Sequence, residues 1–147
     1  MVASDVLEPT SHQRDLKLMG NRFEFTVMSA DKAWAESQID AAIAEVQRIE
    51  RLLTTFTEDS QTNQINAQAG ICPVTVDKEV FDLIQRSLRI SVLTQGAFDI
   101  TYGSIDKSLW NFDTQMTALP DLQTAKKMVR LIHYQNVLLD TEGVLFS

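Results

Sequence analysis

Residues 95–110 contain the side chains of this sequence that are best suited to hold a ligand. Two glycines bracket an aromatic ring, a carboxylate and a hydroxyl: Gly96, Phe98, Asp99, Thr101 and Gly103. Neither a helical period nor a strand alternation accounts for this pattern, and such a turn brings backbone N–H groups and one acid close to a ligand without interference from Cβ atoms. The structural alternative is a loop in which Gly96 ends one helix and Asp99 or Ser104 caps the next.

The rest of the sequence offers few other reactive groups. His12 and His133 are far apart, and neither has a carboxylate or cysteine at metal-ligand spacing, so no metal site is readable. Cys72 is the only cysteine and has no histidine near it in sequence. The five glycines form neither a P-loop nor a dinucleotide fingerprint, and a Gly-x-Ser-x-Gly elbow is absent. We therefore assign no catalytic residue from the sequence.

Composition narrows the class of protein. The 147 residues are 44% hydrophobic, which is enough to bury the core of one domain. Thirteen basic and twenty acidic residues give a net charge of −7, and no basic run is long enough to follow a phosphate backbone, so nucleic acid is not an expected partner. No stretch has the length of a membrane span. Residues 1–17 are expected to form a flexible lead-in, and the first 14 lack the pattern of a signal peptide.

The first half of the chain predicts a strand, a long helix and a loop. Residues 22–28 alternate between apolar and polar side chains, which is typical of a half-buried strand. Asp31 is placed to cap a helix. Apolar residues recur along that helix at spacings of three and four: Ile39, Ala42, Ile43, Val46, Ile49 and Leu53. The helix is expected to pack on a sheet, then to end in a loop over residues 54–60 that precedes a short helix through Ile65.

The second half predicts the elements around the glycine turn. Residues 73–76 resemble an edge strand, and residues 78–94 a helix so apolar that two of its sides should be buried. That helix leads into the turn, and a short helix is expected over residues 104–110. A further helix over 122–132 and a hairpin of strands 134–139 and 144–146 complete the chain. The fold class is α+β, with an antiparallel sheet packed against long amphipathic helices.

Four landmarks give the sequence a resemblance to a known family. They are Leu18-Met19-Gly20-Asn21-Arg22-Phe23, then Arg48-Ile49-Glu50-Arg51-Leu52-Leu53-Thr54-Thr55-Phe56 with Asp59-Ser60, then Gly96-Ala97-Phe98-Asp99-Ile100-Thr101 with Gly103, then Leu109-Trp110-Asn111-Phe112. In order and spacing they resemble the ApbE family, the FAD:protein FMN transferases formerly described as thiamine-biosynthesis lipoproteins. The resemblance runs from about Leu18 to Ser147.

The resemblance implies a T-fold-like α+β domain and a reaction. The reaction is Mg²⁺-dependent cleavage of FAD, with FMN transferred to a threonine of a target flavoprotein and AMP released. At the matching positions, FAD contacts are expected from Met19, Phe56, Ala97, Phe98 and Asp99. An aromatic ring and a thioether offer apolar area to a flavin or adenine ring, and Asp99 offers hydrogen-bond acceptors. In the structural alternative, Met19 and Phe98 are core residues, Phe56 plugs a helix end and Asp99 is a cap.

The sequence also departs from the family pattern. Asn21 stands where the family usually has threonine, and Ser104-Ile105 where it has Pro-Leu. The family's glycine-rich segment and the Mg²⁺ ligands are expected beyond Ser147. Residues 18–147 are therefore interpreted as the amino-terminal part of an ApbE-like domain, incomplete at its carboxyl end and inactive alone.

Several alternatives stay open at this point. The chain is alternatively a flavin-binding or FAD-hydrolysing relative, or a non-catalytic α+β interaction module. Unpaired strand edges at residues 144–146 favour a homodimer. The compartment is not predicted, although relatives of this family are often exported or membrane-anchored in bacteria.

Overall fold

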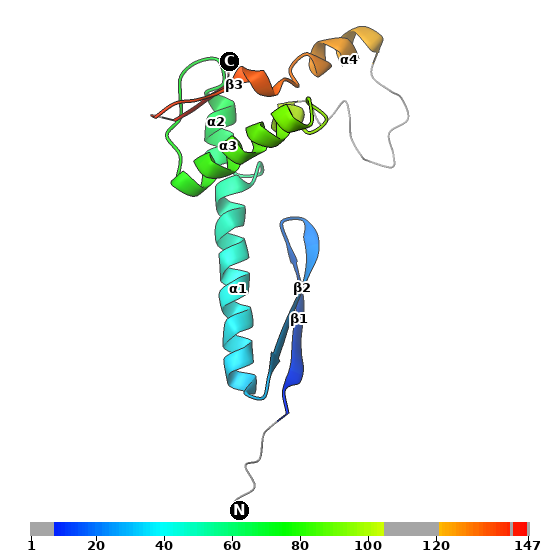
Figure 1. The fold of residues 1–147 in the computed structure, drawn as a ribbon, viewed down its shortest axis with the longest axis vertical. Coiled ribbons are helices and arrows are strands. Elements are labelled where there is room, and N and C mark those ends of the chain that lie inside the picture. Colours follow the sequence, from blue (N-terminus) through cyan, green and yellow to red (C-terminus); the bar gives the residue numbers. More distant parts are fainter. Residues whose placement is uncertain (1–7, 105–120, 142, 147) are drawn as a thin grey trace, which may run out of the picture. The chain divides into compact units, whose positions relative to one another are not determined.

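The computed structural model describes residues 8–104, 121–141 and 143–146. The chain divides into two compact units, residues 1–63 and 64–147, and each is described by itself. The elements drawn in Figure 1 are β1 (Thr10–Leu18), β2 (Asn21–Ser29), α1 (Lys32–Leu53), α2 (Gln61–Ala67), α3 (Lys78–Leu93), the 3-10 helix η1 (Ile100–Ser104), α4 (Leu122–Val129), the 3-10 helix η2 (Tyr134–Asn136), β3 (Val137–Leu139) and β4 (Val144–Phe146).

The first unit is a two-stranded hairpin that lies along the long helix α1 (Figure 1). β1 and β2 pair antiparallel from Thr10 with Ser29 to Leu18 with Asn21. Phe23, Phe25 and Val27 share the half-buried face of β2, as the alternation predicted. The strand prediction for this segment is confirmed, and the strand extends one residue further at each end.

Helix α1 also follows its prediction. The carboxylate of Asp31 accepts a hydrogen bond from the N–H of Trp34 at 3.0 Å, which satisfies one of the free donors of the first turn. Ala35 and Ile39 are buried, and the predicted apolar face continues half-buried through Leu53. This face is the core of the first unit, because it contacts both strands of the hairpin.

The flexible lead-in expected over residues 1–17 is wrong from Thr10 onward, where β1 begins; residues 1–7 lie outside the described part. The strand was missed because two of its helix-facing positions are polar, His12 and Arg14. The guanidinium of Arg14 pairs with the carboxylates of Glu36 and Asp40 on α1, and these hydrogen bonds raise the pKa of Arg14 above its ordinary value. An ion pair thus occupies a position where the strand pattern requires an apolar side chain.

The second unit is built around α3, which buries one stripe of side chains rather than two sides. Val80, Ile84, Ser87 and Ser91 are buried at helical spacing. By contrast, Val92 is 61% and Leu93 81% exposed, so the expectation of burial on two sides is wrong in the described residues. An apolar side chain does not by itself imply burial, since much of a protein surface is apolar.

The remaining elements of this unit differ from their predictions mainly at their ends. Asp121 caps α4 by accepting from the N–H groups of Gln123 and Thr124, and hydrogen bonds from Thr124 lower the pKa of Asp121. α4 ends at Val129, and residues 134–136 form η2 instead of strand. The edge strand expected at 73–76 is reduced to one bridge, Val74 with Val144, because Pro73 has no N–H to extend the ladder.

The structure confirms the α+β class, with antiparallel strands and amphipathic helices. The short helix expected over residues 104–110 lies outside the described residues apart from its start. Among the described helices, none has the length and apolar character needed to cross a membrane.

Candidate functional site

The glycine turn begins with a Schellman motif that ends α3. The N–H of Gly96 donates to the carbonyl of Ser91 at 2.8 Å, and the N–H of Gln95 donates to that of Val92 at 3.1 Å. The left-handed residue of the motif is Gln95, with φ of 53°, followed by Gly96 with φ of 83°. In the structural alternative, Gly96 ends the helix. In the structure, the left-handed residue that ends it is Gln95, one residue earlier.

The next two N–H groups also face the helix end. The N–H of Ala97 donates to the carbonyl of Thr94 at 3.1 Å, and that of Phe98 to the Thr94 hydroxyl, also at 3.1 Å. These donors are therefore engaged within the turn, contrary to the expectation that they face a ligand. The side chains of the turn are what remains exposed, and Phe98 is 43% exposed.

The carboxylate of Asp99 joins the turn to a distant segment of the same unit. One of its oxygens, Oδ1, accepts from the N–H and the hydroxyl of Thr101 at 2.8 and 2.7 Å. The other, Oδ2, accepts from the N–H of Tyr134 at 2.9 Å. Asp99 thus caps η1. The structural alternative also made Asp99 a helix cap, but for the helix expected over residues 104–110. A carboxylate has about four acceptor sites, and the described residues occupy three of those of Asp99.

Thr101 supplies the hydroxyl of the glycine turn, but it was not among the residues expected to contact FAD. Its side chain is 2% exposed, and its hydroxyl accepts from the N–H of His133 at 2.8 Å while donating to Asp99. The spacing Asp-x-Thr is the available sequence signal, because aspartate commonly accepts from the backbone two residues ahead. The segment that it holds could not be identified from that spacing.

Met19 lies in the first unit, in the two-residue turn between β1 and β2. Met19 and Gly20 both have positive φ, 50° and 75°, the geometry of a type I′ hairpin. The N–H of Met19 donates to Oε1 of Glu50 on α1 at 3.0 Å, and the Met19 side chain is 41% exposed. The turn is therefore held against the last turns of α1 with its thioether accessible.

Phe56 follows the same end of α1. The backbone carbonyl of Glu50 accepts from Thr54, which ends the helix, and the Thr54 hydroxyl accepts from the N–H of Phe56 at 3.2 Å. Glu50 thus connects the Met19 turn with the helix end that leads to Phe56. The ring of Phe56 is 93% exposed, so the alternative in which it plugs the helix end is wrong.

Strained backbone conformations occur in the two turns that the resemblance implies in FAD contact. Among the described residues, two non-glycine residues have positive φ, Met19 and Gln95. Each precedes a glycine, and each lies in one of the two turns implied in FAD contact. Such conformations cost free energy and persist where the surroundings require them, often at ligand sites.

The strain at Met19 makes a testable prediction. Asparagine tolerates positive φ better than methionine, and Asn-Gly is a favoured type I′ pair. We expect Met19→Asn to raise the free energy of unfolding by about 1 kcal/mol and to weaken FAD binding, because the apolar contact is lost. Urea melts and flavin fluorescence titrations measure the two effects. Met28→Asn, at a 60% exposed strand position, should produce neither, and a Met19→Asn protein with unchanged stability would contradict the argument.

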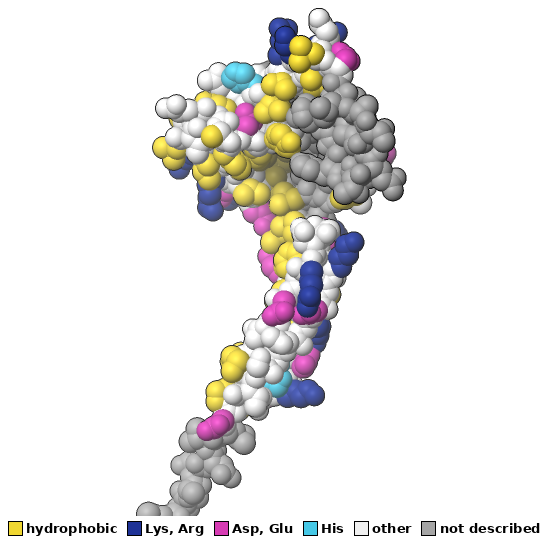
Figure 2. All heavy atoms as spheres, turned by 90° about the vertical axis from the view of Figure 1, so that its right-hand side faces the viewer, with side chains coloured by type: hydrophobic (Ala, Val, Ile, Leu, Met, Phe, Trp, Pro, Cys, Tyr) yellow, Lys and Arg dark blue, Asp and Glu magenta, His cyan; other side chains and the backbone are white. Residues whose placement is uncertain are grey.

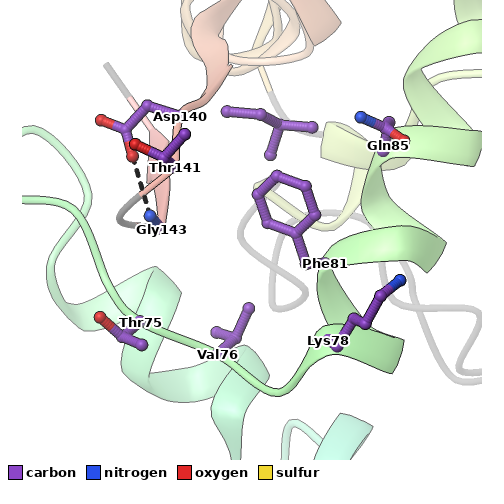
Figure 3. A pocket seen from close by; sticks show the side chains of 9 residues that line it. Thr75, Val76, Lys78, Phe81, Gln85, Asp140, Thr141 and Gly143 are labelled. Carbon is purple, nitrogen blue, oxygen red and sulfur yellow. Dashed lines mark hydrogen bonds between the residues drawn. The ribbon is translucent and has the colours of Figure 1, made fainter.

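A cavity of about 560 Å³ lies elsewhere in the second unit, between the start of α3 and the β3–β4 hairpin (Figure 3). The ring of Phe81 points into it, and Lys78, Gln85, Asp140 and Thr141 line its rim. Lys78 pairs with Asp82. None of the residues predicted to contact FAD lines this cavity, so it is not the site that the resemblance describes.

Charged side chains of both signs lie along the first unit (Figure 2). On the face drawn in Figure 2, basic and acidic side chains are interspersed along the first unit and form no broad basic patch. Within the described part of the chain, no group of three His, Cys, Asp or Glu side chains is placed to hold a metal ion. We therefore assign no metal ligand to the described residues.

Comparison with known proteins gives the family. The model of the ApbE family matches residues 19–146, which is most of the chain. The chain belongs to the ApbE family. An FAD:protein FMN transferase of Klebsiella pneumoniae (strain 342) is 36% identical over 126 residues, covering 82% of the chain and 36% of that relative. One of Treponema pallidum (strain Nichols) is 33% identical over 107 residues, covering 70% and 29%.

Solved structures agree with this ApbE membership. The ApbE protein from Thermotoga maritima superimposes with a TM-score of 0.82 at 25% identity, over 93% of the chain and 45% of that structure. The Pseudomonas stutzeri flavinyl transferase ApbE, in its apo form, has a TM-score of 0.78 at 23% identity over 97% of the chain, which supports the fold. The chain spans between a quarter and two fifths of the length of the curated relatives it matches.

Proposed function

We propose that this chain is the FAD-binding part of an FAD:protein FMN transferase. In that reaction the hydroxyl oxygen of an acceptor threonine attacks the FMN phosphorus of FAD, the pyrophosphate P–O bond breaks, and AMP leaves. Relatives that match the chain bear this activity in their names. The observation that carries the proposal is the match of residues 19–146 to the family, together with the two strained turns at Met19 and Gln95.

The proposed contacts in the first unit are apolar. The exposed ring of Phe56 and the partly exposed thioether of Met19 offer surface to a flavin or adenine ring. The N–H of Met19 donates to Glu50, and the N–H of Phe56 donates to the hydroxyl of Thr54, so the backbone of both residues is held before a ring packs against them. The role of these residues is to bind and orient the dinucleotide.

The proposed contacts in the second unit are Ala97, Phe98 and Asp99. Ala97 and Phe98 are exposed on a turn whose N–H groups from Gln95 to Phe98 donate to the end of α3 and to its C-cap residue Thr94, which holds the turn in place. The remaining acceptor site on Asp99 suits a ribose hydroxyl or a ring N–H of the ligand. This arrangement favours preorganised recognition over a loop that orders on binding.

We propose Mg²⁺ as a requirement of the reaction, but not as a ligand of the described residues. Mg²⁺ would neutralise charge on the pyrophosphate in the transition state. No described cluster of carboxylates fits it, so we derive no step through the metal. An acceptor flavoprotein and a homodimer through unpaired strand edges likewise stay predictions.

Titration of the purified chain with FAD tests the proposal. We expect a dissociation constant that is roughly micromolar to millimolar, since apolar contacts are present and phosphate contacts are few. With Mg²⁺ and a threonine-containing acceptor peptide, we expect no FMN transfer by the chain alone, because most of the length of its relatives has no counterpart in it. Intact-mass analysis of the acceptor measures transfer.

The outcomes separate the candidate functions. Absence of FAD binding at millimolar concentration would refute the proposed site and favour an interaction module. A mass gain of one FMN on the acceptor would contradict the predicted inactivity. Release of AMP without a mass gain would identify a FAD hydrolase.

A further inference from the structure

The hydroxyl of Thr101 connects two segments that are 32 residues apart in sequence. It donates to Oδ1 of Asp99 at 2.7 Å and accepts from the N–H of His133 at 2.8 Å. Asp99 completes the connection by accepting from the N–H of Tyr134 at 2.9 Å. We call the side chains of Asp99 and Thr101, with these bonds, the clamp.

The clamp brings the start of η2 against the glycine turn. A Cβ built on Gly96 would lie 3.8 Å from Cε1 of Tyr134, so the tyrosine ring is in van der Waals range of the turn. Tyr134 itself is half-buried. The turn is therefore held from two sides, by the end of α3 through its N–H groups and by the 133–134 segment through the clamp.

Within the clamp, Thr101 is the member that a ligand does not reach. Its side chain is 2% exposed, and both hydrogen-bonding directions of its hydroxyl are used inside the protein. Asp99, by contrast, is only partly buried, and the described residues occupy three of its roughly four acceptor sites. The orientation of that carboxylate depends on the Thr101 hydroxyl, which supplies one of its three hydrogen bonds.

We propose that Thr101 is a positioning residue for FAD, which orients the carboxylate of Asp99 and fixes Ala97 and Phe98 by clamping the turn to residues 133–134. This proposal rests on the proposed function, because it takes the turn to be part of the FAD site. Preorganisation is the physical reason. Side chains already held in the bound geometry lose less entropy on binding, and a loosened turn must be reordered by the ligand.

Two substitutions test the role of the hydroxyl, one nearly isosteric with threonine and one that keeps the hydroxyl but lacks the methyl group. Thr101→Val removes both hydrogen bonds and keeps the shape, and Thr101→Ser keeps the hydroxyl. We expect Thr101→Val to weaken FAD binding about tenfold, and Thr101→Ser to bind FAD with an affinity close to that of the wild type. Amide hydrogen exchange at His133 and Tyr134 should accelerate in the valine variant and stay slow in the serine variant.

A matched control separates positioning from general destabilisation. Val80→Ala removes a buried methyl pair from α3 in the same unit, where Val80 is 2% exposed, and should lower the melting temperature without changing FAD affinity. Unchanged FAD affinity in Thr101→Val, or an equal loss in Val80→Ala, would overturn the proposal. The exchange measurement needs no ligand: a wild-type chain that fails to bind FAD refutes the proposed function, and unaltered exchange in Thr101→Val refutes the clamp itself.

Discussion

Gly143→Ala is expected to lower the free energy of unfolding of the second unit by about 3 kcal/mol. A Cβ at this position would lie 2.3 Å from the backbone oxygen of Val74 and 2.7 Å from its carbonyl carbon. Backbone atoms of a paired segment do not yield as a flexible side chain does. The residue after it, Val144, exchanges two hydrogen bonds with Val74 at 2.9 and 3.0 Å, so relief of the clash must lengthen or break that bridge.

Gly103→Ala is the matched control for this substitution. No heavy atom lies within 4 Å of a Cβ built there, and its φ is not positive. This variant should be as stable as the wild type or slightly more so, because alanine reduces the entropy of the unfolded chain. Urea unfolding of the two variants measures the difference. Equal midpoints would show that the close approach at Val74 is not maintained in solution.

Asp99→Ala is expected to lower both stability and FAD affinity. Three donors lose their acceptor, the N–H and hydroxyl of Thr101 and the N–H of Tyr134. We expect a loss of about 2 kcal/mol in the free energy of unfolding. FAD binding should weaken by about 1–3 kcal/mol if the remaining acceptor site faces a buried donor on the ligand. Melting curves and flavin fluorescence titrations on the one variant measure both quantities.

Asp99→Asn tests the two carboxylate oxygens separately, because it keeps one acceptor oxygen and replaces the other with a donor. The amide oxygen still accepts from Thr101, whereas the amide nitrogen faces the N–H of Tyr134 and cannot accept, so the loss of stability should be smaller than for alanine. An Asp99→Ala protein that melts earlier yet binds FAD as before would reduce Asp99 to a structural cap. The resemblance of this turn to the ApbE family would then support the fold but not FAD binding at the turn.

Local sequence rules were sufficient for some of the regular elements. The apolar period of α1, the alternation of β2 and the cap at Asp31 were predicted correctly, because each depends on residues within about one turn or one strand. The family followed from landmarks whose order and spacing lie in the sequence itself, and the match over residues 19–146 confirms it. Contact of Met19, Phe56, Ala97, Phe98 and Asp99 with FAD stays a prediction.

Tertiary structure alone decided which residues hold the turns in place. β1 was missed because Arg14 faces carboxylates of α1 that follow it by 22 and 26 residues. The partners of Asp99 and Thr101 at residues 133 and 134 lie more than thirty residues away, and Gly143 is required by the backbone of Val74. Propensity and periodicity describe a residue and its near neighbours, whereas such pairs exist only after the chain has closed a long loop and brought the two segments together.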